Sequence, residues 1–137
     1  MATFLLELVS PEKLLLSRQV EMATLPAAEG EMGVLPGHSP MIVALRGGVI
    51  RVRENGAETE RLFVGGGFAE ISRDRVTILA DEATALASLS RAASERRLAD
   101  AEAALTALPL TESEPKRDAA MARVLALKEA VSVAGAA

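Results

Sequence analysis

The chain has 137 residues, a formal net charge of −4, one histidine and no cysteine. Half of it is apolar, which predicts a folded core, while the missing cysteines exclude disulfides and thiol chemistry. An acidic chain with few aromatic residues argues against nucleic-acid binding, and no apolar run approaches the roughly 18 residues that a spanning helix needs. We therefore expect a globular protein, with no leader peptide, that does not insert into a membrane.

Short β-forming segments alternate with turn residues through the first part of the chain. A spacing of roughly 8 to 12 residues between turns is typical of an antiparallel sandwich or barrel. The expected strands are Phe4–Val9, Leu14–Leu25, Gly33–Leu35, Met41–Leu45, Val49–Arg53, Glu58–Val64, Phe68–Ile71 and Arg75–Ala80.

An Asn-Gly dipeptide between two of these segments gives the sharpest local signal. Both residue types accept the positive φ values of a type I′ turn, which makes a two-residue hairpin loop. That loop places Arg53 opposite Glu58 and Arg51 opposite Glu60, two cross-strand pairs of opposite charge. The same register turns Arg61 inward, so we expect a bulge or a strand end beside it.

Glycine and alanine divide the chain into two parts. Nine of the ten glycines occur by Gly67, whereas alanine rises from 8 in residues 1–82 to 18 in residues 83–137. Glycine breaks helices and alanine favours them, so we expect a β-sandwich domain at 1–84 and a helical domain at 85–137. The predicted fold class is an N-terminal antiparallel β-sandwich followed by a C-terminal antiparallel two-helix hairpin.

The helical part carries two narrow apolar stripes separated by Pro109 and by the cap sequence Ser113-Glu114-Pro115. The stripes contain much alanine, so we expect a marginal hairpin that needs the sandwich as a surface and that could also leave it. The stripe residues are Leu98, Ala101, Leu105 and Leu108 in the first helix, and Ala120, Val124, Leu127, Val131 and Ala134 in the second.

Catalytic chemistry has little support. A hydrolase would use His38 as its base, but the serine that follows it is too close along the chain to be its usual partner. The carboxylates Glu29 and Glu31 are typical of a solvated turn, and Gly65–Gly67 lacks the spacing of a phosphate loop and is better explained by a bulge or tight connection. We expect no catalytic residue and no metal site, and Met41 is expected in the core.

Two groups are left as binding candidates. The loop Gly30–Pro40 holds two prolines, three glycines and the only histidine, and constrained surface loops often carry binding groups. The arginines Arg91, Arg96 and Arg97 either bind an anion or acidic partner or form a solvated, salt-bridged helix face. These features indicate a non-catalytic adaptor.

Several segments resemble the epsilon subunit of bacterial F-type ATP synthases. The most specific is Glu29–Pro40, which contains the pattern Glu-Gly-x-x-Gly-x-x-Pro-Gly-His-x-Pro, and the resemblance spans most of residues 3–84. The family architecture, a β-sandwich followed by a helical hairpin, agrees with the division found from glycine and alanine. The other matching segments are Leu8–Lys13, Val20–Glu21, Leu45–Ile50, Gly66–Ile71 and Val76–Ala80.

The resemblance implies a non-catalytic rotor subunit that couples ion-driven rotation of the c-ring to the catalytic head through the gamma subunit. It implies a location in the bacterial cytoplasm, at the cytoplasmic face of the inner membrane, without direct membrane insertion. The residues that match the family contact loop for the c-ring polar loops and gamma are Glu29, Gly30, Glu31, Pro36, Gly37 and His38.

The resemblance also implies a hairpin that can extend to the alpha and beta subunits of the head and inhibit ATP hydrolysis. Its candidate contact residues are Arg91, Arg96, Arg97, Arg123 and Lys128. ATP-binding members carry aspartate where this chain has Ser88, which speaks against ATP binding, and no cofactor is expected. The alternative hypothesis is a stand-alone β-sandwich binding module with a helical self-association tail.

Overall fold

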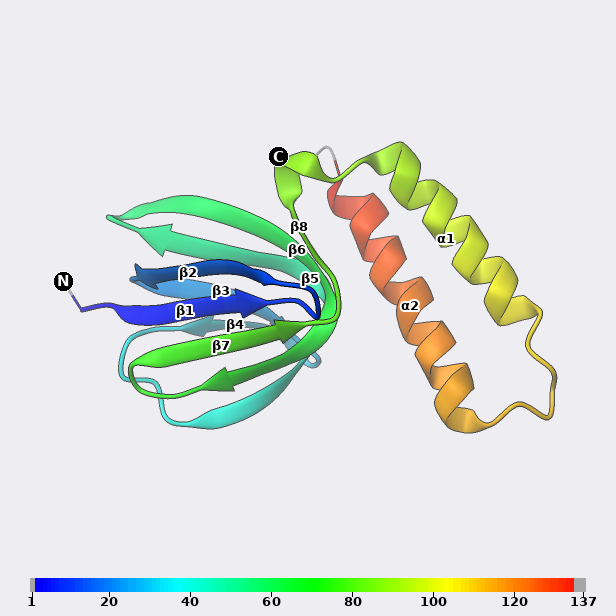
Figure 1. Cartoon of the computed structure of the whole chain (residues 1–137), viewed down its shortest axis with the longest axis horizontal. Helices are drawn as coiled ribbons and strands as arrows, with labels where there is room; N and C mark the ends of the chain where they lie inside the picture. Colours follow the sequence, from blue (N-terminus) through cyan, green and yellow to red (C-terminus); the bar gives the residue numbers. More distant parts are fainter. Residues whose placement is uncertain (1, 135–137) are drawn as a thin grey trace.

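The computed structural model describes residues 2–134, in which a β-sandwich is followed by two helices (Figure 1). Eight strands form one sheet and a short 3-10 helix leads to the helical pair. The elements are β1 (Phe4–Val9), β2 (Leu14–Val20), β3 (Met22–Ala27), β4 (Gly30–Val34), β5 (Met41–Glu54), β6 (Ala57–Ile71), β7 (Arg75–Ala80), β8 (Ala83–Ala85), η1 (Leu86–Ser88), α1 (Arg91–Thr106) and α2 (Glu114–Val133).

The sheet folds over on itself to make the sandwich. Its strand order is β2-β1-β7-β6-β5-β3-β4, with β8 paired to β6. The described pairs are antiparallel except β1 and β7, which are parallel. The long strands β5 and β6 curve at a cluster of glycines, where Gly47 lies opposite Gly65 and Gly67 lies opposite Leu45. The first half of β5 therefore joins the layer of β7 and β1, and its second half joins the layer of β3 and β4 (Figure 1).

Strand boundaries differ from the sequence prediction in a consistent way. The predicted strand Leu14–Leu25 is two strands, since the chain turns at Glu21. Conversely, the predicted pairs of short strands on either side of Gly47 and Gly65–Gly67 are the single strands β5 and β6. Glycine was interpreted as ending a strand, whereas here it lets a continuous strand bend between the two layers.

The Asn-Gly hairpin forms as predicted, but only one of its two predicted cross-strand pairs is present. Asn55 and Gly56 have φ values of 53° and 78°, and Arg53 lies opposite Glu58. A register shift between Val52 and Arg53 then places Arg51 opposite Arg61, so the predicted pairing of Arg51 with Glu60 is wrong. The expected bulge occurs next to the turn rather than beside Arg61 itself.

The core lies between the two layers and is built from alternate residues of the strands. Phe4, Leu6 and Leu8 on β1 are each at most 1% exposed, as is Ile50 on β5. Alternation by two is the geometric consequence of a strand with one face buried, which is why these positions are all apolar. In all, the cluster contains Phe4, Leu6, Leu8, Val20, Ala23, Leu25, Val34, Val43, Leu45, Ile50, Val52, Leu62, Val64, Ala69, Ile71, Val76, Ile78 and Ala80.

The two helices meet along their predicted apolar stripes. Ala101, Val124 and Leu127 form their shared buried cluster, with Leu98 and Leu105 packed against it. Helix α1 begins after Ser90, whose Oγ accepts a hydrogen bond from the amide of Ala93 at 3.1 Å. Ser113 is the N-cap of α2, as predicted, although its side chain makes no capping bond.

Helix α2 lies across the bend of the sandwich. A Cβ added to Gly47 would lie 2.6 Å from the Cα of Ala126, so only glycine permits this approach. Val49 and its cross-strand partner Phe63 are 8% and 2% exposed but do not belong to the sandwich core. Phe63 lines a cavity together with Leu127 and Ala126, and Val49 shares the strand face of Gly47, so both lie on the face against which α2 packs.

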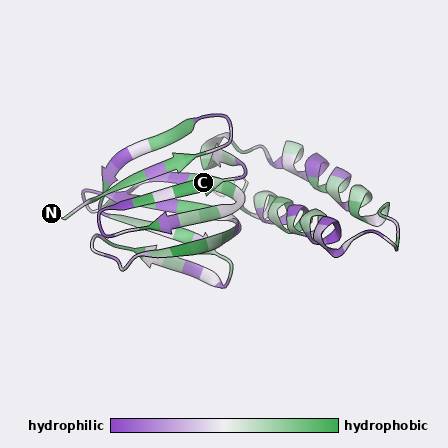
Figure 2. Cartoon of the chain, turned by 60° about the horizontal axis from the view of Figure 1, so that its bottom comes forward, coloured by the Kyte–Doolittle hydropathy of each residue, from purple (hydrophilic) through white to green (hydrophobic). Residues whose placement is uncertain are grey.

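Hydrophilic and hydrophobic segments alternate along both helices (Figure 2). Among residues 2–134, neither helix is long and apolar enough to cross a membrane.

Candidate partner-binding surfaces

The residues predicted to form one contact loop divide into two groups. Glu29 occupies the tight turn between β3 and β4, and Gly30 and Glu31 begin β4. Gly30 has a φ of +141°, a conformation that favours glycine, and it pairs with Ala27 across the hairpin. We name Glu29, Gly30 and Glu31 the acidic turn. Both carboxylates are exposed to solvent.

Pro36, Gly37 and His38 form the second group, the Pro-Gly-His loop, which joins β4 to β5. Gly37 has a φ of +83°, and its amide donates to the carbonyl of Arg73 at 2.8 Å. His38 Nδ1 donates to the backbone oxygen of Ser39 at 2.7 Å, so its imidazole is held against its own loop. These bonds give a surface loop a defined shape.

The two groups border the same stretch of chain, the start of β5. The acidic turn and Met41 to Ala44 line a shallow cavity of about 490 Å³, and the Pro-Gly-His loop runs directly into Met41. Ile42 is 72% exposed and Met41 42% exposed, so the prediction that Met41 belongs to the core is wrong. Carboxylates, a histidine and uncovered apolar side chains therefore meet at one edge of the sandwich.

A second surface, which sequence reasoning missed, crosses the outer face of the sandwich. In register, Leu14 pairs with Val9, Val9 with Leu79, Leu79 with Phe68, and Phe68 with Ala44. Leu14, Phe68 and Leu79 are each more than half exposed. We name these five residues the outer apolar row. A contiguous exposed apolar patch of this kind marks an interaction site, because burying it removes apolar surface from water.

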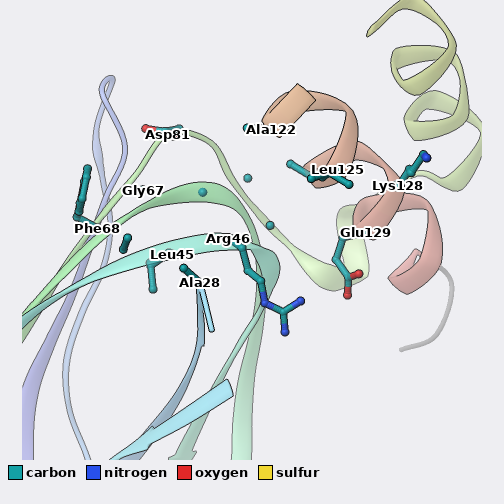
Figure 3. Close-up of a pocket in the computed structure, with 15 residues that line it drawn as sticks. Ala28, Leu45, Arg46, Gly67, Phe68, Asp81, Ala122, Leu125, Lys128 and Glu129 are labelled. Carbon is teal, nitrogen blue, oxygen red and sulfur yellow. The ribbon is translucent and has the colours of Figure 1, made fainter. Parts of the chain in front are cut away.

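The outer apolar row continues into a cleft between the sandwich and α2 (Figure 3). Phe68 and Leu45 lie on its sandwich side and Leu125 of α2 points toward it from the other side. The cleft has a volume of about 710 Å³. Arg46 of β5 and Glu129 of α2 also line it, one from each side.

The five cations predicted to contact the head do not form one surface. Arg97 and Arg123, from different helices, converge on Glu82. Arg91 instead pairs with Glu95 within α1. The remaining two are exposed: Lys128 of α2 lines the cleft, and Arg96 lies on α1.

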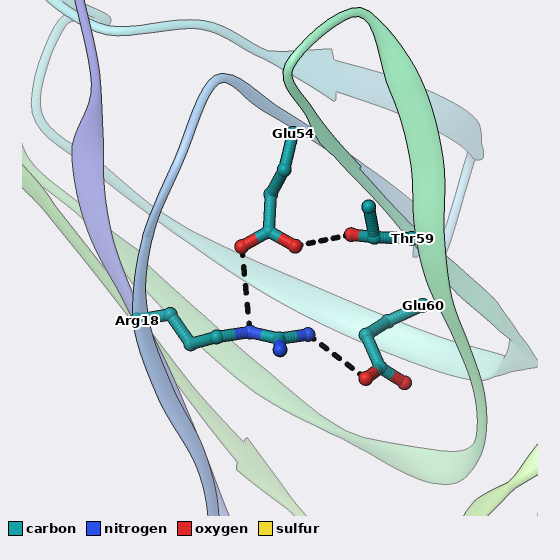
Figure 4. Close-up of polar contacts among 4 residues, drawn as sticks. All are labelled: Arg18, Glu54, Thr59 and Glu60. Carbon is teal, nitrogen blue, oxygen red and sulfur yellow. Dashed lines mark hydrogen bonds and ion pairs between the residues drawn. The ribbon is translucent and has the colours of Figure 1, made fainter.

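A polar cluster of Arg18, Glu54, Thr59 and Glu60 joins strands of the sandwich to one another (Figure 4). Arg18 of β2 lies 3.4 Å from Glu54 and 2.8 Å from Glu60, and Thr59 donates to Glu54. Two carboxylates thus surround one guanidinium, which links the edge strand β2 to the β5–β6 hairpin. The described part of the chain contains no group of three or more potential metal ligands.

Comparison with known proteins assigns the chain to a family. The model of the family described as "ATP synthase, Delta/Epsilon chain, beta-sandwich domain" matches residues 3–86. The chain belongs to this family. It is 54% identical over 134 residues to the ATP synthase epsilon chain of Granulibacter bethesdensis, covering 98% of both chains. It is 44% identical to that of Gluconacetobacter diazotrophicus over 129 residues, covering 94% of this chain and 91% of the relative.

The fold agrees with chains in solved structures of mitochondrial ATP synthases. A chain in the Euglena gracilis mitochondrial ATP synthase assembly of OSCP, F1 and c-ring has a TM-score of 0.71 at 25% identity, covering 94% of this chain and 79% of that chain. A chain of the Tetrahymena thermophila central stalk and c-ring has a TM-score of 0.60 and supports the fold alone, at 13% identity. This family member is a non-catalytic epsilon-type subunit of an ATP synthase, and the resemblance found in its sequence is confirmed.

Proposed function

We propose that the chain is a rotor subunit of the central stalk, which couples ion-driven rotation of the c-ring to the catalytic head through the gamma subunit. In this proposal the complex lies at the cytoplasmic face of a bacterial inner membrane. The outer apolar row carries the proposal. A subunit that transmits torque must stay bound to its partner during rotation, and an exposed apolar stripe on a rigid sheet suits a lasting protein contact.

The outer apolar row is the proposed gamma interface, and point variants on it provide the test. Phe68→Ser and Leu79→Ser each remove a side chain that is more than half exposed, so the sandwich core stays intact. We expect each to weaken binding to purified gamma by roughly tenfold or more in a pull-down titration. The matched control is Leu110→Ser, because Leu110 is 98% exposed in the loop between the helices.

Unchanged gamma affinity of both row variants would contradict this interface. Self-association of the full chain without affinity for gamma would instead favour the stand-alone binding module. Binding of gamma that is lost only with the row variants would support the rotor proposal.

The acidic turn and the Pro-Gly-His loop are the proposed contact with the polar loops of the c-ring and with gamma. Their support is the way the bonded loop and exposed carboxylates border one edge of the sandwich. Glu31→Lys reverses an exposed charge without disturbing the core. We expect ATP-driven ion pumping by the reconstituted complex to fall while ATP hydrolysis persists. The control Glu12→Lys, an exposed charge in the β1–β2 turn, is expected to pump normally.

We further propose that the helical hairpin, residues 85–137, is a domain separate from the sandwich at 1–84 and that it inhibits ATP hydrolysis by contact with alpha and beta. Its thin shared core and alanine-rich stripes support a unit that can detach. Deletion of residues 86–137 is expected to raise ATP hydrolysis by the assembled head, with gamma affinity as the control for sandwich folding. Unchanged hydrolysis with normal gamma affinity would contradict the inhibitory role.

A further inference from the structure

One carboxylate of the sandwich contacts both helices of the hairpin. Glu82 lies in the turn between β7 and β8. Its Oε1 is 2.6 Å from Nη2 of Arg97 on α1, and its Oε2 is 3.6 Å from Nη1 of Arg123 on α2. Within residues 2–134, these are the two ion pairs that join the sandwich to the hairpin.

The apolar contact beside these two ion pairs combines one small side chain with two larger ones. Helix α2 meets the bend of the sandwich through Ala126 against Gly47, and Phe63 lines a cavity with Ala126 beside its cross-strand partner Val49. Ala126 itself buries little area, so the apolar part of docking depends on Val49 and Phe63. Two partly exposed ion pairs add to this apolar burial and together shift a docking equilibrium by roughly three- to tenfold.

The ion pairs with Glu82 also limit which other groups Arg97 and Arg123 can contact. While Glu82 is paired with both guanidinium groups, its single negative charge offsets part of their two positive charges, and both side chains face the sandwich. A carboxylate-bearing surface elsewhere would need the same donors, since guanidinium pairs most strongly with carboxylate. Glu82 and such a surface therefore compete for one pair of side chains.

We infer that Glu82 is an internal competitor that holds the hairpin on the sandwich by occupying Arg97 and Arg123, so that docking and contact with an acidic partner surface exclude each other. The first part of this inference, the hold that Glu82 exerts on the hairpin through its two ion pairs, concerns this chain alone. The competition with a partner rests on the proposed contact with the catalytic head.

A single reporter thiol in the full-length chain, which has no cysteine of its own, tests whether Glu82 keeps the hairpin on the sandwich. Val49→Cys places that thiol under α2, where the native side chain is 8% exposed, so its rate of labelling by a maleimide reports how often the hairpin lifts. Adding Glu82→Gln preserves the shape of the side chain and removes its charge. We expect labelling to accelerate by roughly three- to tenfold. Salt at about 1 M should accelerate labelling in the Glu82 background by a similar factor and have little effect after Glu82→Gln.

The matched control is Glu95→Gln, which breaks the ion pair with Arg91 inside α1 and leaves both ion pairs of Glu82 intact. Its labelling rate is expected to stay at the starting value. Unchanged labelling after Glu82→Gln would overturn the hold. Equal acceleration by both variants would also overturn it, because the cause would then be general weakening of the helices.

ATP hydrolysis by the assembled complex separates the hold from the proposed inhibition. We expect Glu82→Gln to lower hydrolysis, since a released hairpin leaves Arg97 and Arg123 free for the head. Faster labelling with unchanged hydrolysis would support the hold and contradict the inhibitory contact. Unchanged labelling would contradict the hold whatever the hydrolysis rate.

Discussion

The sandwich and the helical hairpin are stabilised in different ways. The sandwich encloses a contiguous cluster that runs from Phe4 to Ala80 and includes large side chains at near-zero exposure. The helices share only Ala101, Val124 and Leu127 as a buried cluster, and α2 finishes its burial against the sandwich. A region with its own core keeps its shape alone, whereas a region without one depends on the surface it touches.

This difference suits a subunit with one permanent and one conditional contact. The outer apolar row and the loops at the start of β5 are carried by the stable layers. The hairpin cations lie on the part that has only a small buried cluster of its own. Low local stability is where movable elements are expected, because they must open at small energetic cost.

The largest expected effect is the loss of stability when a side chain of the sandwich core is truncated. Ile50→Ala removes a core side chain that is 1% exposed, and we expect it to destabilise the chain by about 2 to 5 kcal/mol through lost burial and a residual cavity. Urea denaturation followed by far-UV circular dichroism at the β signal measures this loss of stability.

Leu127→Ala, at a residue that is 3% exposed in the helix cluster, is expected to loosen the helices while the urea transition of the sandwich stays in place. A shift of the sandwich transition by Leu127→Ala equal to that of Ile50→Ala would refute the distinction.

A smaller effect separates the two regions without unfolding either. Gly47→Val places side-chain atoms against the backbone of Ala126, and overpacking of this kind costs about 1 to 3 kcal/mol. We expect α2 to leave the bend, which hydrogen–deuterium exchange would detect as lost protection around Val49 and Phe63. The control is Gly33→Ala, because the atom that it would meet is the flexible terminal methyl of Met22. Retained protection in Gly47→Val would show that docking does not depend on close approach at the bend.

The smallest effect is confined to one helix end. Ser90→Ala removes the hydrogen bond that caps α1 at the amide of Ala93, which is expected to cost about 1 kcal/mol of helix stability. The loss should appear as fraying of the first turn of α1 in amide exchange. Ser113→Ala is the matched control, since the Ser113 side chain makes no capping bond. Equal fraying in the two variants would contradict the role given to Ser90.

Local patterns predicted local features well. The Asn55-Gly56 turn, the meeting of Val124 and Leu127 with the α1 stripe, and the change from sheet to helix all follow from residue preferences that act over a few positions. The errors arose where a pattern has two structural solutions. Glycine breaks a strand or bends it, and the facing glycines of β5 and β6 do the latter.

The candidate surfaces were less accessible to sequence reasoning. The motif from Glu29 to Pro40 identified both loops at the start of β5, but not the exposure of Met41 and Ile42 beside them. The outer apolar row could not be predicted because its members come from five separate strands or strand ends. Their neighbourhood exists only once the strands are in register.

The sequence alone therefore determined the order of a β part and a helical part, the main turn, the helix stripes and the family. These depend on short-range backbone preferences, hydrophobic periodicity and motif spacing. The tertiary structure alone decided that β5 and β6 bend through both layers, that Leu14, Phe68 and Leu79 share one outer face, and that Glu82 meets Arg97 and Arg123. Such contacts join residues far apart in the chain, and only packing and strand register bring them within reach of one another.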